Sequence, residues 1–394
     1  MRFFLFILLT ISLYGESLNS LIQKGFNNNP IIQSLLIEAD LKDFDIANSK
    51  LYKNPTITLG INDINFDDPE KRDLEAMQTN YISISQQITN SDKLHYKTLL
   101  SKTDKKITLL KLKEEKNKLI RNIYQYYFRY LQLKKQIQLT KEKITNIEKI
   151  NSYHTNHIQH KKAFQDILNN DLFTDKLNLQ ILLDNEKQKQ ILIELSKLTN
   201  EEITTLSKSK YNLNNISNSI NNHPLLLIAN SKIEKNNYLK SLAKENQSSD
   251  YTISIGYYNR DSFDDYANIA LKIPLNIYGK EKNDLSKAHK SIDIAQQRFN
   301  EVNLKLKRDF KINSSKLNLA QNSLVLIKNI NGHLVKEKEL ISNKNSLDSI
   351  VEILKIENKL LDNKILKSQY TKDIQLAKLE LIYLTSSLQG LHNE

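Results

Sequence analysis

The chain has 394 residues and a formal net charge of +12, with 39% hydrophobic residues, 7 Gly, 5 Pro and no Cys. The absence of Cys excludes disulfides, thiolate metal sites and a lipid-modified N-terminal Cys. Lys is interspersed with Glu and Asp, without a basic patch or interleaved aromatics, so the positive charge does not indicate a nucleic-acid partner. Few Gly and Pro and a low apolar content favour long amphipathic helices that bury a narrow stripe.

The N-terminus has the three parts of a secretory signal peptide. Arg2 supplies the positive charge, residues 3–14 form the apolar core, and Gly15 precedes the polar Glu16. We therefore assign residues 1–15 to a signal peptide and expect the mature chain to be exported. No later run approaches the roughly 18 apolar residues that a membrane-spanning helix needs, so any membrane entry must use strands.

The first part of the mature chain, residues 16–206, predicts a helix followed by a β-hairpin. Asn27–Pro30 opens the helix, because Pro suits the first helical turn after Asn. Residues of about 55–63 and 79–90 then alternate between apolar and polar side chains, which is typical of strands with two different faces.

Two long helices follow this first hairpin. From Ser91 to about His160 there is no Pro or Gly, and apolar residues recur near heptad spacing, from Ile123 and Tyr127 to Ile147. Such a helix would span roughly 100 Å and would pack its narrow seam against a neighbouring helix. The segment 158–167 predicts a turn into a returning helix, so the pair forms an antiparallel helical hairpin.

The second part, residues 207–394, repeats this order. Asn221–Pro224 resembles the earlier helix start, and residues of about 250–259 and 266–278 alternate as a second pair of strands. Another uninterrupted helix, a turn at 343–348 and a final helix to about Leu388 complete the series. The chain therefore reads as one duplicated architecture, mainly α with a small β part.

The strand lengths point to an outer membrane. Strands of about 9–11 residues cross such a membrane in a tilted barrel, but known barrels start at eight strands and this chain supplies fewer. Unpaired strand edges are too costly in lipid, so copies of the chain must pool their strands into one shared barrel. The long helices would continue from the barrel as a coiled-coil tube, which makes the assembly a conduit.

The arrangement resembles the TolC-type outer membrane efflux protein family over essentially the whole mature chain. The resemblance rests on the Asn–x–Pro helix starts, the hairpin ending in Ile273–Leu275 with Gly279–Lys280, and the turn near 346–348, within an order that occurs twice. It implies a homotrimer with a twelve-stranded transmembrane β-barrel and a periplasmic α-barrel. It also implies docking, through a periplasmic adaptor protein, onto an inner-membrane efflux pump, and a location in the outer membrane with a long periplasmic extension.

By the same resemblance, we assign Pro274 and Gly279 to the strand-to-helix junction. The first half departs from it: Gln87 stands where the second half has Pro274, and Ser91–Asp92 replaces the Gly. We expect these departures to loosen the first junction without threatening the architecture.

By the same resemblance, the helix turns near Asp166 and Asp348 would form the narrow periplasmic entrance. Asp348 and Glu352 lie one helical turn apart and could share a face. Three copies would then make a carboxylate ring, so we name Asp166, Asp348 and Glu352 as a candidate entrance gate. The alternative is that these are ordinary solvated acids near helix starts, where the helix dipole favours them.

A second candidate is the series His154, His157 and His160. Their spacing brings successive pairs together on a helix, as a transition-metal site could require. No acidic ligand lies between them and they stand where the helix is expected to end, so exposed histidines are the preferred interpretation and no metal site is assigned.

Nothing in the chain indicates catalysis. There is no nucleophile elbow or Gly-rich phosphate loop, and the carboxylates are dispersed along Lys-rich helices. We therefore expect neither an enzyme nor a cofactor.

The predicted function is an exit duct that passively conducts small molecules or metal ions from adaptor and pump to the exterior. Two alternatives stay open: the outer membrane component of type I protein secretion, and a periplasmic coiled-coil scaffold without a channel. Tyrosines at the strand ends favour a channel, because a lipid-facing barrel carries an aromatic girdle. The tyrosines concerned are Tyr251, Tyr257, Tyr258, Tyr266 and Tyr278.

Overall fold

A computed structural model describes residues 15–155, 161–214, 216–217, 219–342, 347–385 and 388. The expected signal peptide, residues 1–15, lies outside these ranges except for Gly15. The helices and strands are α1 (Leu18–Asn28), α2 (Pro30–Asn48), β1 (Thr56–Asn62), β2 (Thr79–Ile88), α3 (Ser91–Thr155), α4 (Lys161–Thr199), α5 (Pro224–Glu245), β3 (Tyr251–Asn259), β4 (Tyr266–Lys272), α6 (Lys280–Ser342) and α7 (Leu347–Leu384).

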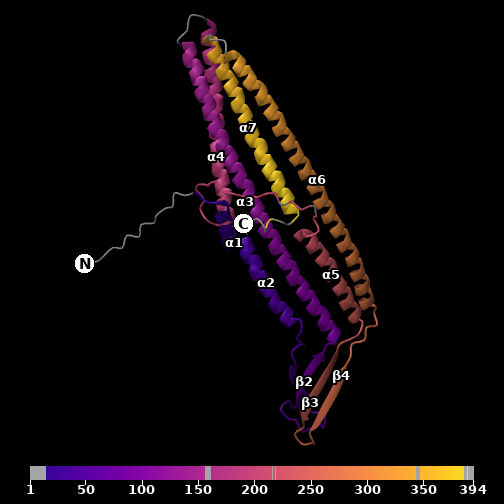
Figure 1. Cartoon of the computed structure of the whole chain (residues 1–394). Helices are drawn as coiled ribbons and strands as arrows, with labels where there is room; N and C mark the ends of the chain where they lie inside the picture. The colour runs from indigo at the N-terminus through magenta and orange to yellow at the C-terminus, as the bar shows by residue number, and fades with distance from the viewer. Residues whose placement is uncertain are drawn as a thin grey trace, which may run out of the picture. The chain divides into compact units, whose positions relative to one another are not determined.

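The order of helix, hairpin, long helix and shorter helix occurs twice, as α2-β1-β2-α3-α4 and as α5-β3-β4-α6-α7 (Figure 1). The mainly helical fold with a small antiparallel sheet is confirmed. That residues 16–206 and 207–394 are copies of one another stays a prediction. The structure separates into two compact units, and each unit takes segments from both halves of the sequence.

The first unit, here called the helical unit, comprises Met1–Ser34, Leu112–Pro224 and Asn303–Glu394. Its core is aromatic and aliphatic: Tyr124, Tyr127 and Phe128 of α3 are almost fully buried, with Leu195 and Leu379. Most of the seam predicted for α3 is buried here: Ile123, Tyr127, Tyr130, Leu133 and Ile147 are buried, whereas Ile137 and Ile144 are half-buried.

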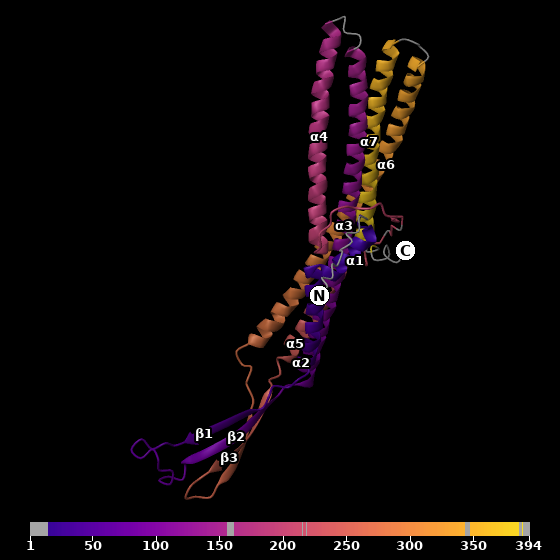
Figure 2. The same ribbon diagram turned by 90° about the vertical axis from the view of Figure 1, so that its left-hand side faces the viewer.

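Polar contacts join the long helices within the helical unit. Gln136 of α3 donates to Asp184 of α4 at 2.7 Å, and Lys338 of α6 pairs with Glu357 of α7 at 2.7 Å. Figures 1 and 2 show that α3 and α6 end, and α4 and α7 begin, at the same end of this unit. The two helical hairpins predicted from the sequence are therefore side by side and point the same way.

An irregular segment between α4 and α5 is tied to the core by one tyrosine. The Tyr127 hydroxyl donates to the Ser207 carbonyl at 3.1 Å and accepts from the Ser209 amide at 2.6 Å. A nearby close approach involves Gly25 of α1, where a Cβ would stand 2.8 Å from Leu119 Cδ2. These contacts place the segment and α1 against the same stretch of α3.

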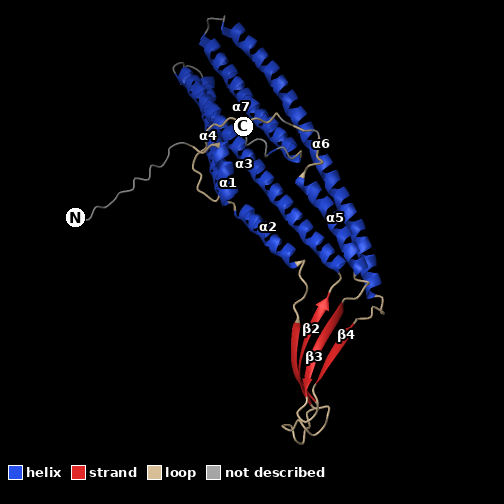
Figure 3. Ribbon diagram, turned by 60° about the horizontal axis from the view of Figure 1, so that its bottom comes forward, coloured by secondary structure: helices blue, strands red, loops and turns tan. Residues whose placement is uncertain are grey.

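The second unit, the sheet unit, comprises Leu35–Lys111 and Leu225–Val302. Its four strands form one antiparallel sheet in the order β1-β2-β3-β4 (Figure 3). β4 ends at Lys272, six residues before the expected end at 278. Pro274 explains the difference, because proline has no N–H to donate to the neighbouring strand.

We predict that Tyr127→Phe lowers the stability of the helical unit by about 1–2 kcal/mol, because it leaves a part-buried backbone N–H and C=O without their partner. Thermal unfolding followed by circular dichroism measures this. The matched control is Tyr370→Phe in α7 of the same unit, which should change stability by less than about 0.5 kcal/mol. Equal effects of the two substitutions would contradict the role given to the Tyr127 hydroxyl.

Candidate functional site

One face of the sheet is apolar and open. Cross-strand pairs such as Leu59–Ile82 and Ile255–Ile269 place aliphatic side chains opposite one another. Leu59 is 73% exposed and Ile269 is 79% exposed. The apolar side chains on this face are Ile57, Leu59, Ile61, Ile82, Ile84, Ile253, Ile255, Tyr257, Ala267, Ile269 and Leu271. A contiguous apolar face of this extent is unfavourable in water and calls for an apolar surrounding.

The other face of the sheet is polar. It carries Thr58, Ser83, Ser254 and Asn268 at successive strands, and Lys272 near its end. These side chains form hydrogen bonds with water at no cost. The sheet thus separates an apolar side from a polar one, as the alternation in the sequence predicts.

A stack of three tyrosines crosses the polar face. The rings of Tyr81 and Tyr258 lie 5.1 Å apart, and those of Tyr258 and Tyr266 lie 4.9 Å apart with planes within 5°. Glycine makes room for the stack, because a Cβ on Gly60 would stand 2.5 Å from the Tyr81 ring. We call Tyr81, Tyr258 and Tyr266 the tyrosine stack.

The tyrosine stack corrects the girdle expected from the sequence. Tyr258 and Tyr266 belong to the polar face, whereas Tyr257 is on the apolar face. Tyr251 also lies on the apolar face, since it pairs with Ile88. Tyr278 follows β4 and is 92% exposed. Only part of the predicted set is therefore placed to face an apolar phase.

The first strand-to-helix junction is held by Asp250. Its carboxylate accepts from Lys93 at 2.7 Å, from Gln87 at 3.0 Å and from Thr89 at 3.3 Å. Burial alone would raise the pKa of Asp250, but the hydrogen bond and charge of Lys93, with those of Gln87 and Thr89, hold that pKa below its ordinary value. We call these four residues the Asp250 clamp.

The expectation that Gln87 loosens this junction stays a prediction, and two contacts of Gln87 speak against it. Gln87 keeps a backbone N–H that proline lacks, so β2 stays paired with β3 as far as Ile88, and its side chain adds a bond to Asp250. The second junction is built differently. Pro274 follows the end of β4, and Gly279 takes φ +76°, a left-handed conformation, just before α6 begins.

The candidate gate residues belong to α4 and α7, which begin at one end of the helical unit (Figure 2). Asp166 is half-buried in α4, and Glu352 is exposed in α7. Asp348 lies in the first turn of α7, and its side chain falls outside the described part. The assignment of a gate stays a prediction.

The histidine series is covered only in part. His154 is half-buried near the end of α3, while His157 and His160 lie outside the described residues. Within the described ranges, no group of three or more His, Cys, Asp or Glu side chains could hold a metal ion.

A buried polar cluster in the helical unit was not found from the sequence. Tyr383 of α7 donates to Glu114 of α3, whose side chain is 3% exposed, and burial raises the pKa of that carboxyl. Burial, with the positive charges of Arg121 and Lys118, lowers the pKa of the neighbouring His223 to about 4. His223 is therefore uncharged at neutral pH, and in both groups burial shifts the pKa toward the uncharged form.

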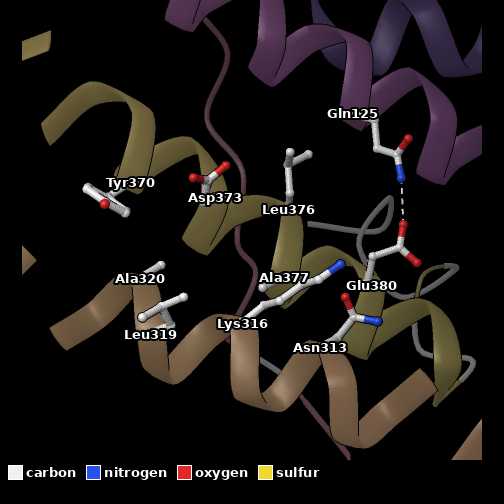
Figure 4. Close-up of a pocket in the computed structure, with 10 residues that line it drawn as sticks. All are labelled: Gln125, Asn313, Lys316, Leu319, Ala320, Tyr370, Asp373, Leu376, Ala377 and Glu380. Atoms are coloured by element: carbon white, nitrogen blue, oxygen red, sulfur yellow. Dashed lines mark hydrogen bonds between the residues drawn. The ribbon is translucent and has the colours of Figure 1, made fainter. Parts of the chain in front are cut away.

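A cavity of about 540 Å³ lies between α3, α6 and α7 of the helical unit (Figure 4). Glu380 accepts a hydrogen bond from Gln125 on its wall, and Asp373 and Lys316 add one charge of each sign. The mixed charge of this cavity indicates no particular ligand.

None of the helices in the described ranges combines the length and the apolar character that crossing a membrane would require. No family model and no curated protein matches the sequence. The structure nevertheless aligns with solved outer membrane proteins over nearly their whole length.

The Campylobacter jejuni CmeC outer membrane channel aligns with 94% of this chain and 86% of its own, at TM-score 0.67 and 16% identity. The outer membrane protein VceC of Vibrio cholerae aligns over 94% and 96%, at TM-score 0.72 and 12% identity. The Neisseria gonorrhoeae MtrE outer membrane channel, in its open state, aligns over 92% and 88%, at TM-score 0.71 and 11% identity. The chain therefore has the fold of outer membrane channels, and the TolC-type resemblance is confirmed at the level of the fold.

We predict that Asp250→Asn lowers the stability of the sheet unit by about 1–3 kcal/mol at pH 7, because it leaves the Lys93 ammonium, 6% exposed, without its carboxylate. A lowered carboxyl pKa stabilises the fold above the unfolded value of 3.8, and this contribution is lost as pH falls through the folded value. The wild-type protein should therefore lose more stability than the variant below pH 3.8.

Thermal unfolding at several pH values measures this difference. Asp43→Asn is the control, because its partner Lys105 belongs to the same unit and Asp43 is 59% exposed. An exposed pair contributes at most about 1 kcal/mol. If the two variants unfold alike at every pH, the Asp250 clamp does not stabilise the junction.

Proposed function

We propose that this protein is the exit channel of an efflux system in the outer membrane. Three copies would pool their sheets into one transmembrane β-barrel, and the helices of the helical units would line a periplasmic α-barrel. Small molecules or metal ions would pass through it, delivered by a periplasmic adaptor and an inner-membrane pump. The observation that carries this proposal is the two-faced sheet.

The sheet supports the proposal through its edges. Within the described residues, no strand pairs with the outer edge of β1 or of β4. An apolar face favours lipid, but unpaired backbone groups in lipid cost several kcal/mol each. Pairing β1 of one copy with β4 of the next removes both edges and gives every backbone group a partner.

The number of copies follows from the width that a barrel needs for an open lumen. Two copies of this four-stranded sheet would make a barrel of eight strands, which side chains fill. Three copies, the number that the TolC-type resemblance implies, leave an open interior lined by the polar face. A periplasmic scaffold has no use for an exposed apolar sheet face, so this feature favours the channel over the scaffold.

We predict that Ile255→Lys prevents trimer insertion into the outer membrane whereas Ser254→Lys does not. The two residues are neighbours on β3 but belong to opposite faces. Lysine on a lipid face costs about 2–4 kcal/mol at the midplane, whereas lysine in a watery lumen costs little. Heat-dependent trimer bands from purified outer membranes measure insertion. Equal loss in both variants, or none in either, contradicts the assignment of the faces.

We further propose that Asp348 and Glu352, with Asp166, ring the periplasmic entrance. We predict that Asp348→Asn combined with Glu352→Ala raises the conductance in planar bilayers by about twofold and weakens cation preference, because a narrow ring of carboxylates binds cations at the constriction and slows their passage. Asp284→Asn with Glu301→Ala, two exposed acids of α6 in the sheet unit, is the control of equal charge.

Three results are distinguishable in this measurement. A conducting trimer that responds only to the helix-end variant supports both channel and gate. A conducting trimer that responds equally to both variants retains the channel and removes the gate. A protein that forms no trimer and no pore overturns the proposed function itself.

A further inference from the structure

A second cavity of the helical unit, of about 400 Å³, differs from the one in Figure 4 by its charge. It lies between α3, α7 and Tyr211 of the irregular segment. The residues that line it are Phe128, Leu131, Gln132, Lys135, Tyr211, Lys364, Lys367, Ser368, Thr371, Lys372 and Gln375. We call it the lysine cavity.

Four ammonium groups and no carboxylate line the lysine cavity. Lys372 has Asp373 at 3.1 Å, and Lys135 donates to the amide of Gln138 at 3.1 Å. In the part of the chain that the structure describes, Lys364 and Lys367 are exposed and have no carboxylate within 4.0 Å. Gathered cations repel one another, and an anion between them relieves that repulsion.

The lysine cavity also has an aromatic floor. Phe128 is 1% exposed and meets Tyr211 edge to face at 4.9 Å between ring centroids. Gln375 donates to the Tyr211 hydroxyl and holds the ring in place. An aromatic or aliphatic body of a ligand would find an apolar surface here, below the charged groups.

Most of the polar groups around the floor are hydrogen-bond donors or can act as such. Lys364, Lys367, Ser368, Thr371 and Gln375 recur at helical spacing on one side of α7, so they line the same side of the cavity. The cavity of Figure 4, on another side of α7, has the carboxylates of Asp373 and Glu380 instead. Of these two cavities, the lysine cavity is therefore the one that favours a negatively charged ligand.

We propose that the lysine cavity binds a small organic anion, with an apolar or aromatic body on Phe128 and Tyr211 and a carboxylate or phosphate held by Lys364 and Lys367. Its volume fits a small molecule. The site goes beyond the proposed channel and does not depend on it, because every lining residue belongs to one copy of the helical unit.

The test is isothermal titration calorimetry on the purified full chain in detergent, with matched detergent in the ligand solution. The probes are 1-naphthoate and 1-naphthyl phosphate, which separate carboxylate from phosphate, and 1-naphthylmethylammonium, which has the same body and the opposite charge. At least one anion should bind with measurable heat, more weakly as salt rises, and the cation about tenfold more weakly or not at all.

Lys364→Gln combined with Lys367→Gln should lower the affinity for the anion about tenfold. Lys355→Gln with Lys359→Gln removes the same charge from exposed positions of α7 outside the cavity, and should leave the affinity within about twofold. All four lysines are exposed, so both variants should fold, which circular dichroism checks.

Three other results would contradict the proposed anion site. Absence of binding by both anions, equal binding of the cation, or equal loss in the two double variants would show that the lysines do not form an anion site. Trimer formation and conductance are measured separately, so failure of the channel and failure of this site are distinguishable.

Discussion

The requirement that every backbone N–H and C=O find a partner governs this protein. The apolar face of the sheet favours a non-aqueous surrounding, where water cannot serve the edges of β1 and β4. A single chain cannot meet that requirement, because its sheet has two ends and too few strands to close. The sheet of one chain therefore leaves this requirement unmet at its two edges, and the trimer proposed above would meet it.

The same requirement operates where strands give way to helices. At the first strand-to-helix junction the Asp250 clamp joins β2, β3 and α3, because one carboxylate accepts hydrogen bonds from Lys93, Gln87 and Thr89. At the second junction Pro274 ends the pairing of β4 with β3, and Gly279 turns the chain into α6. Two different local chemistries thus produce the same succession of hairpin and long helix.

Much of the fold could be predicted from periodicity. Alternation over β1 to β4 and the heptad seam of α3 are local patterns, and local patterns survive in a single sequence. The faces of Tyr257 and Tyr258 could also have been separated, since neighbouring residues in a strand point to opposite sides. Lys93 and Asp250 could not have been paired, because their contact joins residues 157 positions apart and depends on the completed sheet. The lysine cavity could not have been predicted from the sequence either, because its Tyr211 lies in a segment without periodicity.

The tyrosine stack gives the sheet an optical property of its own. The chain contains no Trp, so tyrosine dominates its near-ultraviolet absorption. Tyr258 and Tyr266 lie nearly parallel at 4.9 Å, a separation at which the electronic transitions of two rings couple. Tyr81 of β2 stacks on Tyr258 of β3 at 5.1 Å, and these two rings come from different hairpins, so their coupling exists only when the two hairpins are joined. The sheet therefore carries an intrinsic chromophore that reports the pairing of its two halves, without any label.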